Sequence, residues 1–140
     1  MLSMKNQIID EIKSQNIVSE VRDFYSQADP IFPMITVQEF PTSTGLMTNG
    51  QPNIVTNYYQ FEIYCKNTIL NKVITSANDK LFEFGVALDN YVNTKYLMNQ
   101  VGEPIILPYP SDQTVMRWVV RYSLILGENN DGTISTYRRY

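Results

Sequence analysis

Apolar residues recur along this chain at two spacings, helical and alternating, and each spacing predicts a different element. Near the amino terminus, Met4, Ile8 and Ile12 recur at helical spacing, with charged residues elsewhere around the helical wheel. This pattern predicts an amphipathic helix over residues 4–16 that packs on a sheet. Ser3 precedes the helix and is placed to accept a hydrogen bond from an otherwise unpaired amide of the first turn.

Strict alternation of apolar and polar residues predicts the strands of that sheet. Residues 57–66 have the clearest pattern, and residues 114–126 alternate with apolar side chains on both faces, which predicts a central strand. Residues 34–40 predict a further strand. The polar stretch 127–132 predicts a turn, because Asn, Asp and Gly tolerate the backbone angles of hairpins, and residues 133–140 then form its antiparallel partner.

The segments between these strands differ in kind. Residues 41–52 hold two glycines, two prolines and an Asn-Gly pair, which predicts a long loop, and loops of about a dozen residues are usually functional or mobile. A second helix is predicted to begin at Asn67 or Thr68 and to end at Gly85, as a left-handed cap, or one turn later. Residues 96–110 fit either short edge strands or an ordered arm.

These elements together predict a single α+β domain over residues 1–140. We expect an antiparallel or mixed sheet of about four to five strands, with two helices packed on one face and a long β-hairpin loop. A chain of 140 residues that is 44% hydrophobic can bury one core without the help of disulfides or metal.

The composition excludes several classes of enzyme. There is no histidine and only one cysteine, so histidine-dependent nucleophilic catalysis, a thiolate metal cluster and a CxxC redox pair cannot be built within this chain. The common phosphate, dinucleotide and zinc-protease motifs are absent, and the 14 acidic residues show no obvious pair. Cys65 falls on an apolar strand face, as expected of a small buried hydrophobe. We therefore expect no enzymatic activity, no catalytic residue, no metal and no cofactor.

The charge also limits the partners. A net charge of −3 has the wrong sign for a protein that grips phosphates over much of its surface. Cysteine usage favours an intracellular protein, and the first residues lack the continuous apolar stretch of a signal peptide. No run approaches the roughly 20 apolar residues of a membrane span, so we expect no membrane partner.

Tyrosines and arginines suggest a protein interface, because both residue types are enriched at the energetic centres of interfaces. Ten tyrosines lie largely in the strands, where they either form an interface or merely complete the sheet. Arginines on two neighbouring strands form a basic stripe, either for a subunit contact or as solvated charge. The candidate interface residues are Thr44, Gly45, Leu46, Met47, Thr48, Asn49 and Gly50 of the long loop, with Arg117, Arg121, Arg138, Arg139 and Tyr140.

The order of these segments resembles a family of tailed-bacteriophage proteins, the tail terminators and head-tail joining (minor capsid, tail completion) proteins. The resemblance covers nearly the full chain and is strongest in an Arg-Tyr strand that a final Tyr-Arg strand follows. Residues 86–110 form a longer segment than the family pattern has. The resembling segments are PMITVQEF at 33–40, YYQFEIYCKN at 58–67, AND at 77–79, RWVVRY at 117–122 and ISTYR at 134–138.

This resemblance implies a non-enzymatic structural protein of the virion tail or neck, assembled in the host cytoplasm. Members typically form a six-subunit ring that caps the tail tube, stops its polymerisation and presents a surface to the head. The implied partners are further copies of the chain, the tail-tube protein and the head-tail connector or stopper protein. Genomic DNA would pass through the channel of the ring without specific binding.

Two alternatives stay open at the level of sequence. The first is a head-completion or connector ring, either a stopper or an adaptor, which residues alone do not separate from a terminator. The second is a small intracellular ligand-binding or regulatory domain whose tyrosine-rich sheet holds a small molecule. A deep, closed apolar pocket in the monomer would favour this second alternative.

Overall fold

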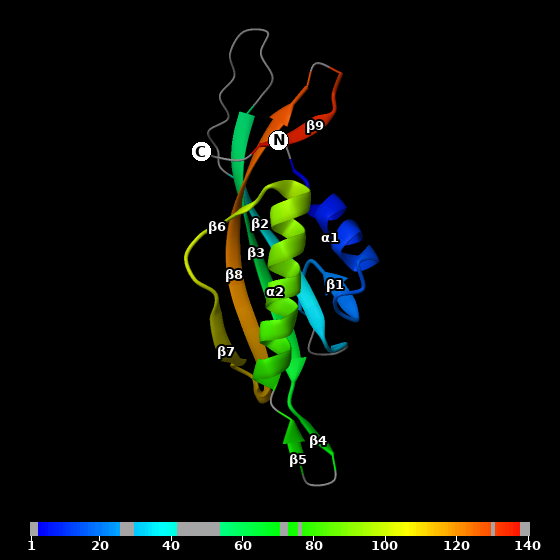
Figure 1. Cartoon of the computed structure of the whole chain (residues 1–140), viewed down its shortest axis with the longest axis vertical. Helices are drawn as coiled ribbons and strands as arrows, with labels where there is room; N and C mark the ends of the chain where they lie inside the picture. Colours follow the sequence, from blue (N-terminus) through cyan, green and yellow to red (C-terminus); the bar gives the residue numbers. More distant parts are fainter. Residues whose placement is uncertain are drawn as a thin grey trace.

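A computed structural model describes residues 3–25, 30–41, 54–70, 73–75, 77–129 and 131–137. Two helices and a large sheet make an elongated molecule (Figure 1). The elements in chain order are α1 (Lys5–Ser14), β1 (Glu20–Arg22), β2 (Met34–Pro41), β3 (Ile54–Lys66), β4 (Thr68–Leu70), β5 (Val73–Thr75), α2 (Ala77–Tyr96), β6 (Asn99–Gln100), β7 (Ile105–Tyr109), β8 (Asp112–Glu128) and β9 (Ile134–Tyr137).

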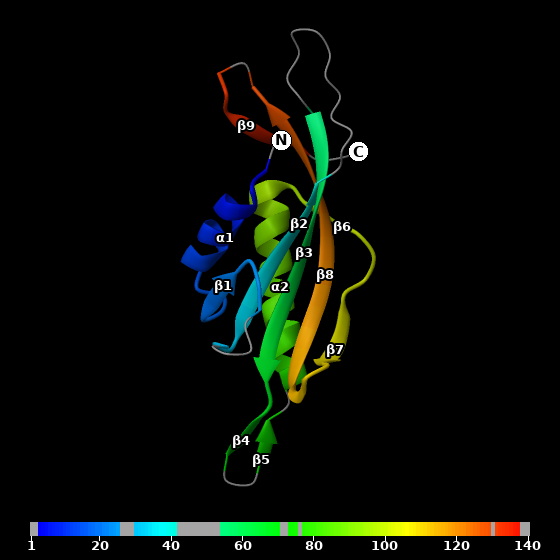
Figure 2. The same ribbon diagram turned by 180° about the vertical axis from the view of Figure 1, so that it is seen from behind.

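The main sheet has seven strands, with β1, β2, β3 and β8 side by side and β6, β7 and β9 all paired with β8. The β1–β2 pair is parallel and the other pairs are antiparallel. Both helices lie on one face, and the opposite face of β2, β3 and β8 carries no described helix (Figures 1 and 2). The predicted α+β class is therefore confirmed. The sheet has more strands than expected because β1 and β6 are only three and two residues long, too short for a recognisable alternation.

The long alternating patterns form the centre of the sheet, as predicted. β3 and β8 pair along their length from Ile54 opposite Gly127 to Lys66 opposite Val115. Their helix-side residues build the main core, and Tyr59, Phe61 and Ile63 are fully buried there. α1 adds Ile8 and Ile12 to this core; the Ser3 hydroxyl accepts a hydrogen bond from the Lys5 amide at 3.4 Å, and the same hydroxyl donates to Glu39.

The predicted start of the second helix was wrong. A hairpin, β4–β5, precedes the helix, and α2 begins only at Ala77. The hairpin is rich in β-branched residues, which favour strands over helices. Asn67 nevertheless caps the helix, because its Oδ1 accepts a hydrogen bond from the Ala77 amide at 2.9 Å across the hairpin.

The predicted end of the second helix at Gly85 was also wrong. Gly85 lies in the middle of α2, which continues to Tyr96 and is followed by Leu97 with a positive φ of 62°. A Cβ atom at Gly85 would lie 2.6 Å from Cε2 of Trp118, closer than any real contact. The glycine therefore permits close packing of α2 on β8 rather than a turn.

Three further segments, residues 96–110, the long loop and the last strand, can be compared with their predicted structure. Of the two forms that fitted residues 96–110, the structure shows the edge strands β6 and β7. β2 extends one residue into the predicted loop, to Pro41, and the rest of that loop, residues 42–52, lies outside the described residues. β9 is shorter than predicted in the described part, and residues 138–140 also lie outside it.

A second, smaller cluster packs on the sheet face opposite the helices. Met34, Tyr64 and Val115 are buried there beneath Tyr25, Phe32 and Tyr109. Burial, followed by the charge of the Glu62 carboxylate, raises the pKa of Tyr64 to about 12.

This raised pKa predicts a loss of stability in alkali. The free energy of unfolding holds while Tyr64 is neutral in both states, and it falls as pH rises from about 10, the unfolded value, through about 12. Tyr64→Phe should flatten this decline by up to about 1.4 kcal/mol per pH unit in urea unfolding. At pH 8, where Tyr64 is neutral in both the folded and the unfolded state, the wild-type chain and the Tyr64→Phe variant provide the reference difference in stability. If their free energies of unfolding then fall in parallel above pH 10, this role of Tyr64 is refuted.

Candidate interaction surfaces

Within the part of the chain that the structure describes there is no group of three or more potential metal-ligating side chains. None of the described helices is both long and apolar enough to cross a membrane. Cys65 is buried and its thiol pKa is raised to about 11 by that burial, so the reactive thiolate is scarce at neutral pH. Two exposed surfaces of the described residues have the composition of interaction sites.

The first surface is the sheet face that no described helix covers, which we call the open sheet face (Figure 2). Register places Arg117 and Arg121 of β8 on it, as predicted, beside Glu62 and Gln60 of β3 and Phe40 of β2. The structure brings these two arginines onto one face but gives them different surroundings.

Arg117 is engaged within the fold. Its Nη1 lies 3.0 Å from Oε1 of Glu62, and the exposed fractions of these side chains are only 22% and 12%. Its guanidinium carbon also lies 6.0 Å from the ring centroid of Tyr109. These contacts give Arg117 a role within the fold, and its choice as an interface residue stays a prediction.

Arg121 remains exposed on the open sheet face. Its Nη2 donates to Oε1 of Gln60 at 2.9 Å, and its guanidinium carbon lies 4.9 Å from the ring centroid of Phe40. Tyr137 of β9 pairs with Ile125, so it lies on this same face, with 43% of its surface exposed. The open sheet face thus combines aromatic groups with a cation, the chemistry typical of interface centres.

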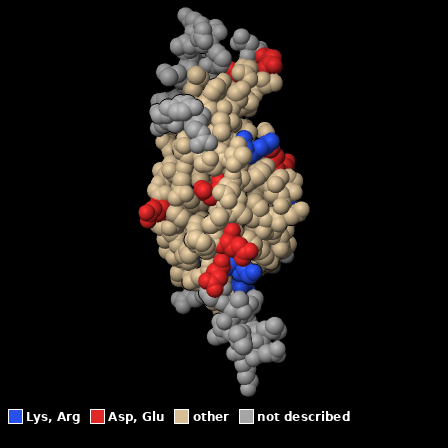
Figure 3. All heavy atoms as spheres, viewed as in Figure 1, with Lys and Arg blue, Asp and Glu red and all other residues tan. Residues whose placement is uncertain are grey.

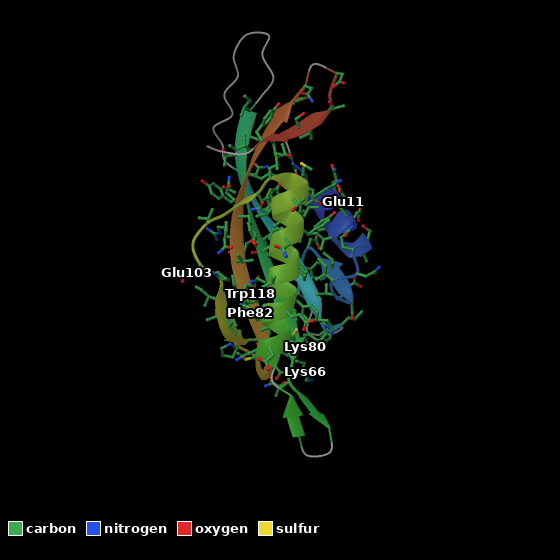
Figure 4. The ribbon with its side chains drawn as sticks, viewed as in Figure 1. Glu11, Lys66, Lys80, Phe82, Glu103 and Trp118 are labelled. Atoms are coloured by element: carbon green, nitrogen blue, oxygen red, sulfur yellow. The ribbon has the colours of Figure 1, made fainter. Side chains whose placement is uncertain are left out.

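The second surface is a hollow of about 170 Å³ between α2 and the β6–β7 segment, which we call the α2–β7 hollow. Figure 4 shows Trp118 and Phe82 close to each other beside α2, on the side of the molecule that carries β7. The rings of Phe82 and Trp118 meet edge-on at 6.1 Å. The hollow is lined by Gly85, Val86, Asp89, Gln100, Pro104, Trp118 and Tyr122.

Apolar side chains around this hollow are unusually exposed. Phe82 is 61% exposed and Val86 45% exposed, although Trp118 and Tyr122 at its floor are buried. On the neighbouring edge strand, Ile106 is 38% exposed. Clustered apolar exposure of this kind marks interaction sites more often than isolated exposed residues do.

One carboxylate, that of Asp89, is among the residues that line the hollow. Asp89 Oδ1 accepts a hydrogen bond from the Tyr122 hydroxyl at 2.7 Å. Glu103 precedes the lining residue Pro104 but lies at the outer edge of the molecule, away from Trp118 (Figure 4). Glu83 pairs with Lys80 at 3.7 Å, whereas Asp89 and Glu103 form no ion pair with another described residue. Burial, followed by the hydrogen bond to Asp89, raises the pKa of Tyr122 well above its usual range. On this face uncharged atoms predominate, with acidic groups and a few basic groups scattered among them (Figure 3).

A further hollow of about 210 Å³ lies beside the second cluster, with Tyr25, Phe32, Lys66, Tyr109 and Asp112 among its lining residues. Small-molecule sites usually measure about 300 to 1,000 Å³ and are mostly apolar. Neither this hollow nor the α2–β7 hollow is a deep, closed apolar pocket of that size. The ligand-binding alternative therefore gains nothing from these two hollows.

Most of the predicted interface residues cannot be placed. Arg138, Arg139 and Tyr140 lie outside the described residues, and so does the loop from Thr44 to Gly50. Sequence reasoning missed the α2–β7 hollow altogether. Two signals were present, a glycine inside a helical pattern and the single tryptophan of the chain, but their meeting depends on how α2 docks on β8.

Comparison with models of known protein families and with curated protein sequences finds no match to this chain.

Proposed function

We propose that this protein is a structural ring subunit at the head-proximal end of a phage tail. In this role it ends tail-tube polymerisation and joins the tail to the head, with genomic DNA passing through its channel. The phage role comes from the sequence resemblance. A head-completion or connector ring is the nearest alternative, because it needs the same kind of subunit contact.

One structural observation carries the assembly part of this proposal. The molecule has two unlike exposed surfaces, the apolar and acidic α2–β7 hollow and the aromatic and basic open sheet face. A ring forms when one surface of each subunit meets a different surface of the next, and when the rotation between subunits closes. Unlike surfaces of opposite charge on one small domain meet the first requirement.

Charge and chemistry are compatible with this role. A net charge of −3 would let DNA slide past without being trapped, because like charges repel phosphates. A ring subunit of this kind requires no cofactor, and its localisation would be the virion tail or neck. The proposed partners are other copies of the chain, the tail-tube protein and the connector or stopper protein.

Tail-tube growth provides the test of this function. Added to polymerising tail-tube protein of the same phage, the protein should bind tube ends and stop growth. A variant lacking residues 44–50 should unfold at the same temperature as the full chain yet fail to stop growth, because the loop is proposed to dock on the tube. Tube lengths are measured in electron micrographs. Tubes that grow on unaffected by the full chain would refute the terminator role, and an equally effective loop variant would refute the docking role of the loop.

A further inference from the structure

We propose that the exposed side of α2 in one copy of this chain packs across the open sheet face of the next copy. This inference rests on the proposed ring and names the contact that would join one subunit to its neighbour. Both surfaces are formed by residues that the structure describes.

Five exposed residues of α2 form a stripe on the side of the helix opposite its buried residues. They recur every three or four residues, a spacing that brings side chains onto one side of a helix. Two of them are apolar and two are acidic, and the set, which we call the α2 stripe, consists of Asp79, Phe82, Glu83, Val86 and Asn90. Val86 also lines the α2–β7 hollow, so the stripe continues the second surface described above.

The open sheet face carries apolar groups around an exposed arginine. The guanidinium of Arg121 lies over Phe40, which is 41% exposed. The Val101 amide donates to the Arg121 carbonyl oxygen at 2.8 Å, which continues the β6–β8 register and places Val101 on the same face. Ile105, opposite Val119 of β8, lies there too and is 55% exposed. Exposed sheet faces normally carry polar residues, so this apolar patch indicates an interaction site.

Size and charge suit the two surfaces to each other. The patch crosses four neighbouring strands, from β2 to the β6–β7 segment, and at about 4.8 Å between strands it spans roughly 14 Å. A helix with its side chains is about 10 to 12 Å across. Glu83 shares its charge with Lys80, 3.7 Å away, whereas Asp79 and Arg121 form no ion pair with a described residue. The acidic stripe therefore meets a cation that can pair with it.

The α2 stripe and the patch cannot meet within one molecule. α2 lies on one face of the sheet and the patch lies on the other (Figures 1 and 2). Leu81, Leu88 and Val92 hold α2 in place, because all three are fully buried in the core between the helix and the strands. The contact therefore joins two copies. Its two sides differ, so each copy keeps one surface free for the next copy, as a closed ring requires.

Cross-linking between two full-length variants tests this contact. One variant carries Val86→Cys on the α2 stripe and the other carries Gln38→Cys, an exposed position that the β2–β3 register places on the open sheet face. The chains carry different tags, and a short bismaleimide joins their thiols only where two copies bring them together. Cys65 can stay in place because it is buried. Lys95→Cys is the matched control on α2, because Lys95 is exposed but turned toward Glu11 of α1, 3.5 Å away.

The Val86→Cys and Gln38→Cys pair should cross-link at least about tenfold more than the Lys95→Cys and Gln38→Cys pair, either alone or once tail tubes are added. The reason is that only position 86 lies on the surface proposed to face the neighbouring copy. Equal yields from the two pairs under both conditions would overturn the contact.

Charge reversal gives a second readout, which a misfolded variant cannot imitate. Asp79→Lys with Glu83→Lys in the Val86→Cys chain should remove most of the product, because the new cations would meet Arg121. Arg121→Glu in the Gln38→Cys chain should also remove it, and should restore the product when both chains carry reversed charges. If the combination fails to restore the product, the pairing of the α2 stripe with Arg121 is wrong.

The outcomes for the contact and for the ring are separate. If electron micrographs show rings while the Val86→Cys and Lys95→Cys chains give equal yields, the ring stands and this contact is wrong. If the Val86→Cys product forms in tenfold excess without any ring, the contact stands and the ring is wrong. If a photoactivatable maleimide on Gln38→Cys attaches to tail-tube protein rather than to another copy, the open sheet face docks on the tube and this contact is wrong.

Discussion

Gly85→Ala should lower the free energy of unfolding by about 2 kcal/mol, although the same change at an ordinary helix position stabilises a protein by about 1 kcal/mol. The new methyl group would lie 2.6 Å from Cε2 and 2.7 Å from Cζ2 of Trp118, a side chain held between α2 and the core face of β8. Either α2 or the indole must move, and both carry buried neighbours. The loss is measured by urea unfolding, in which the midpoint should shift while the m-value, the dependence of the unfolding free energy on urea concentration, stays unchanged.

Two further variants separate packing from helix propensity. Ala87→Gly, at an exposed position two residues along α2, should cost about 1 kcal/mol through propensity alone. Trp118→Leu removes the indole, so adding Gly85→Ala to it should cost less than it does in the wild-type chain. A neutral or stabilising Gly85→Ala would contradict the close packing of α2 on β8, and with it the shape of the α2–β7 hollow.

Arg117→Met should lower the free energy of unfolding by about 3 kcal/mol, because it leaves the Glu62 carboxylate without its cation in a site that water hardly reaches. Arg121→Met on the same strand and face should cost at most about 1 kcal/mol, since Arg121 is exposed and loses only surface contacts. The pair is a matched comparison of one residue type on one strand.

The ion pair itself is tested by a second substitution. Replacing Glu62 by Leu in the Arg117→Met chain should recover part of the loss, because no unpaired charge then stays buried. Equal destabilisation by Arg117→Met and Arg121→Met would contradict the division of this stripe into a structural and an exposed arginine. Thermal or urea unfolding of the four proteins decides between these outcomes.

The parts of the fold that sequence predicted are those with long and local patterns. The alternation in residues 57–66 and 114–126 is long enough to identify β3 and β8, the two central strands. The β4–β5 hairpin was missed because its apolar residues also fit a helical spacing, and because its three-residue strands leave no alternation to recognise. The cap at Asn67 was predicted, but not that its hydrogen bond crosses a hairpin.

The surfaces were less predictable because they depend on pairing between distant segments. Alternation alone places Arg117 and Arg121 on one face, which the register of β8 confirms. It cannot show that Glu62 on β3 lies beside only one of them, because the register between strands is set by the whole sheet. The α2–β7 hollow likewise exists only once α2 docks over Trp118.

The most direct measurement of the central claim is the mass and shape of the purified full-length protein over a range of concentrations. Light scattering combined with negative-stain images should reveal closed rings with a central hole, alone or once tail tubes are added, with about six times the mass of one chain. A monomer at every concentration, with no ring at the ends of added tail tubes, would contradict the account.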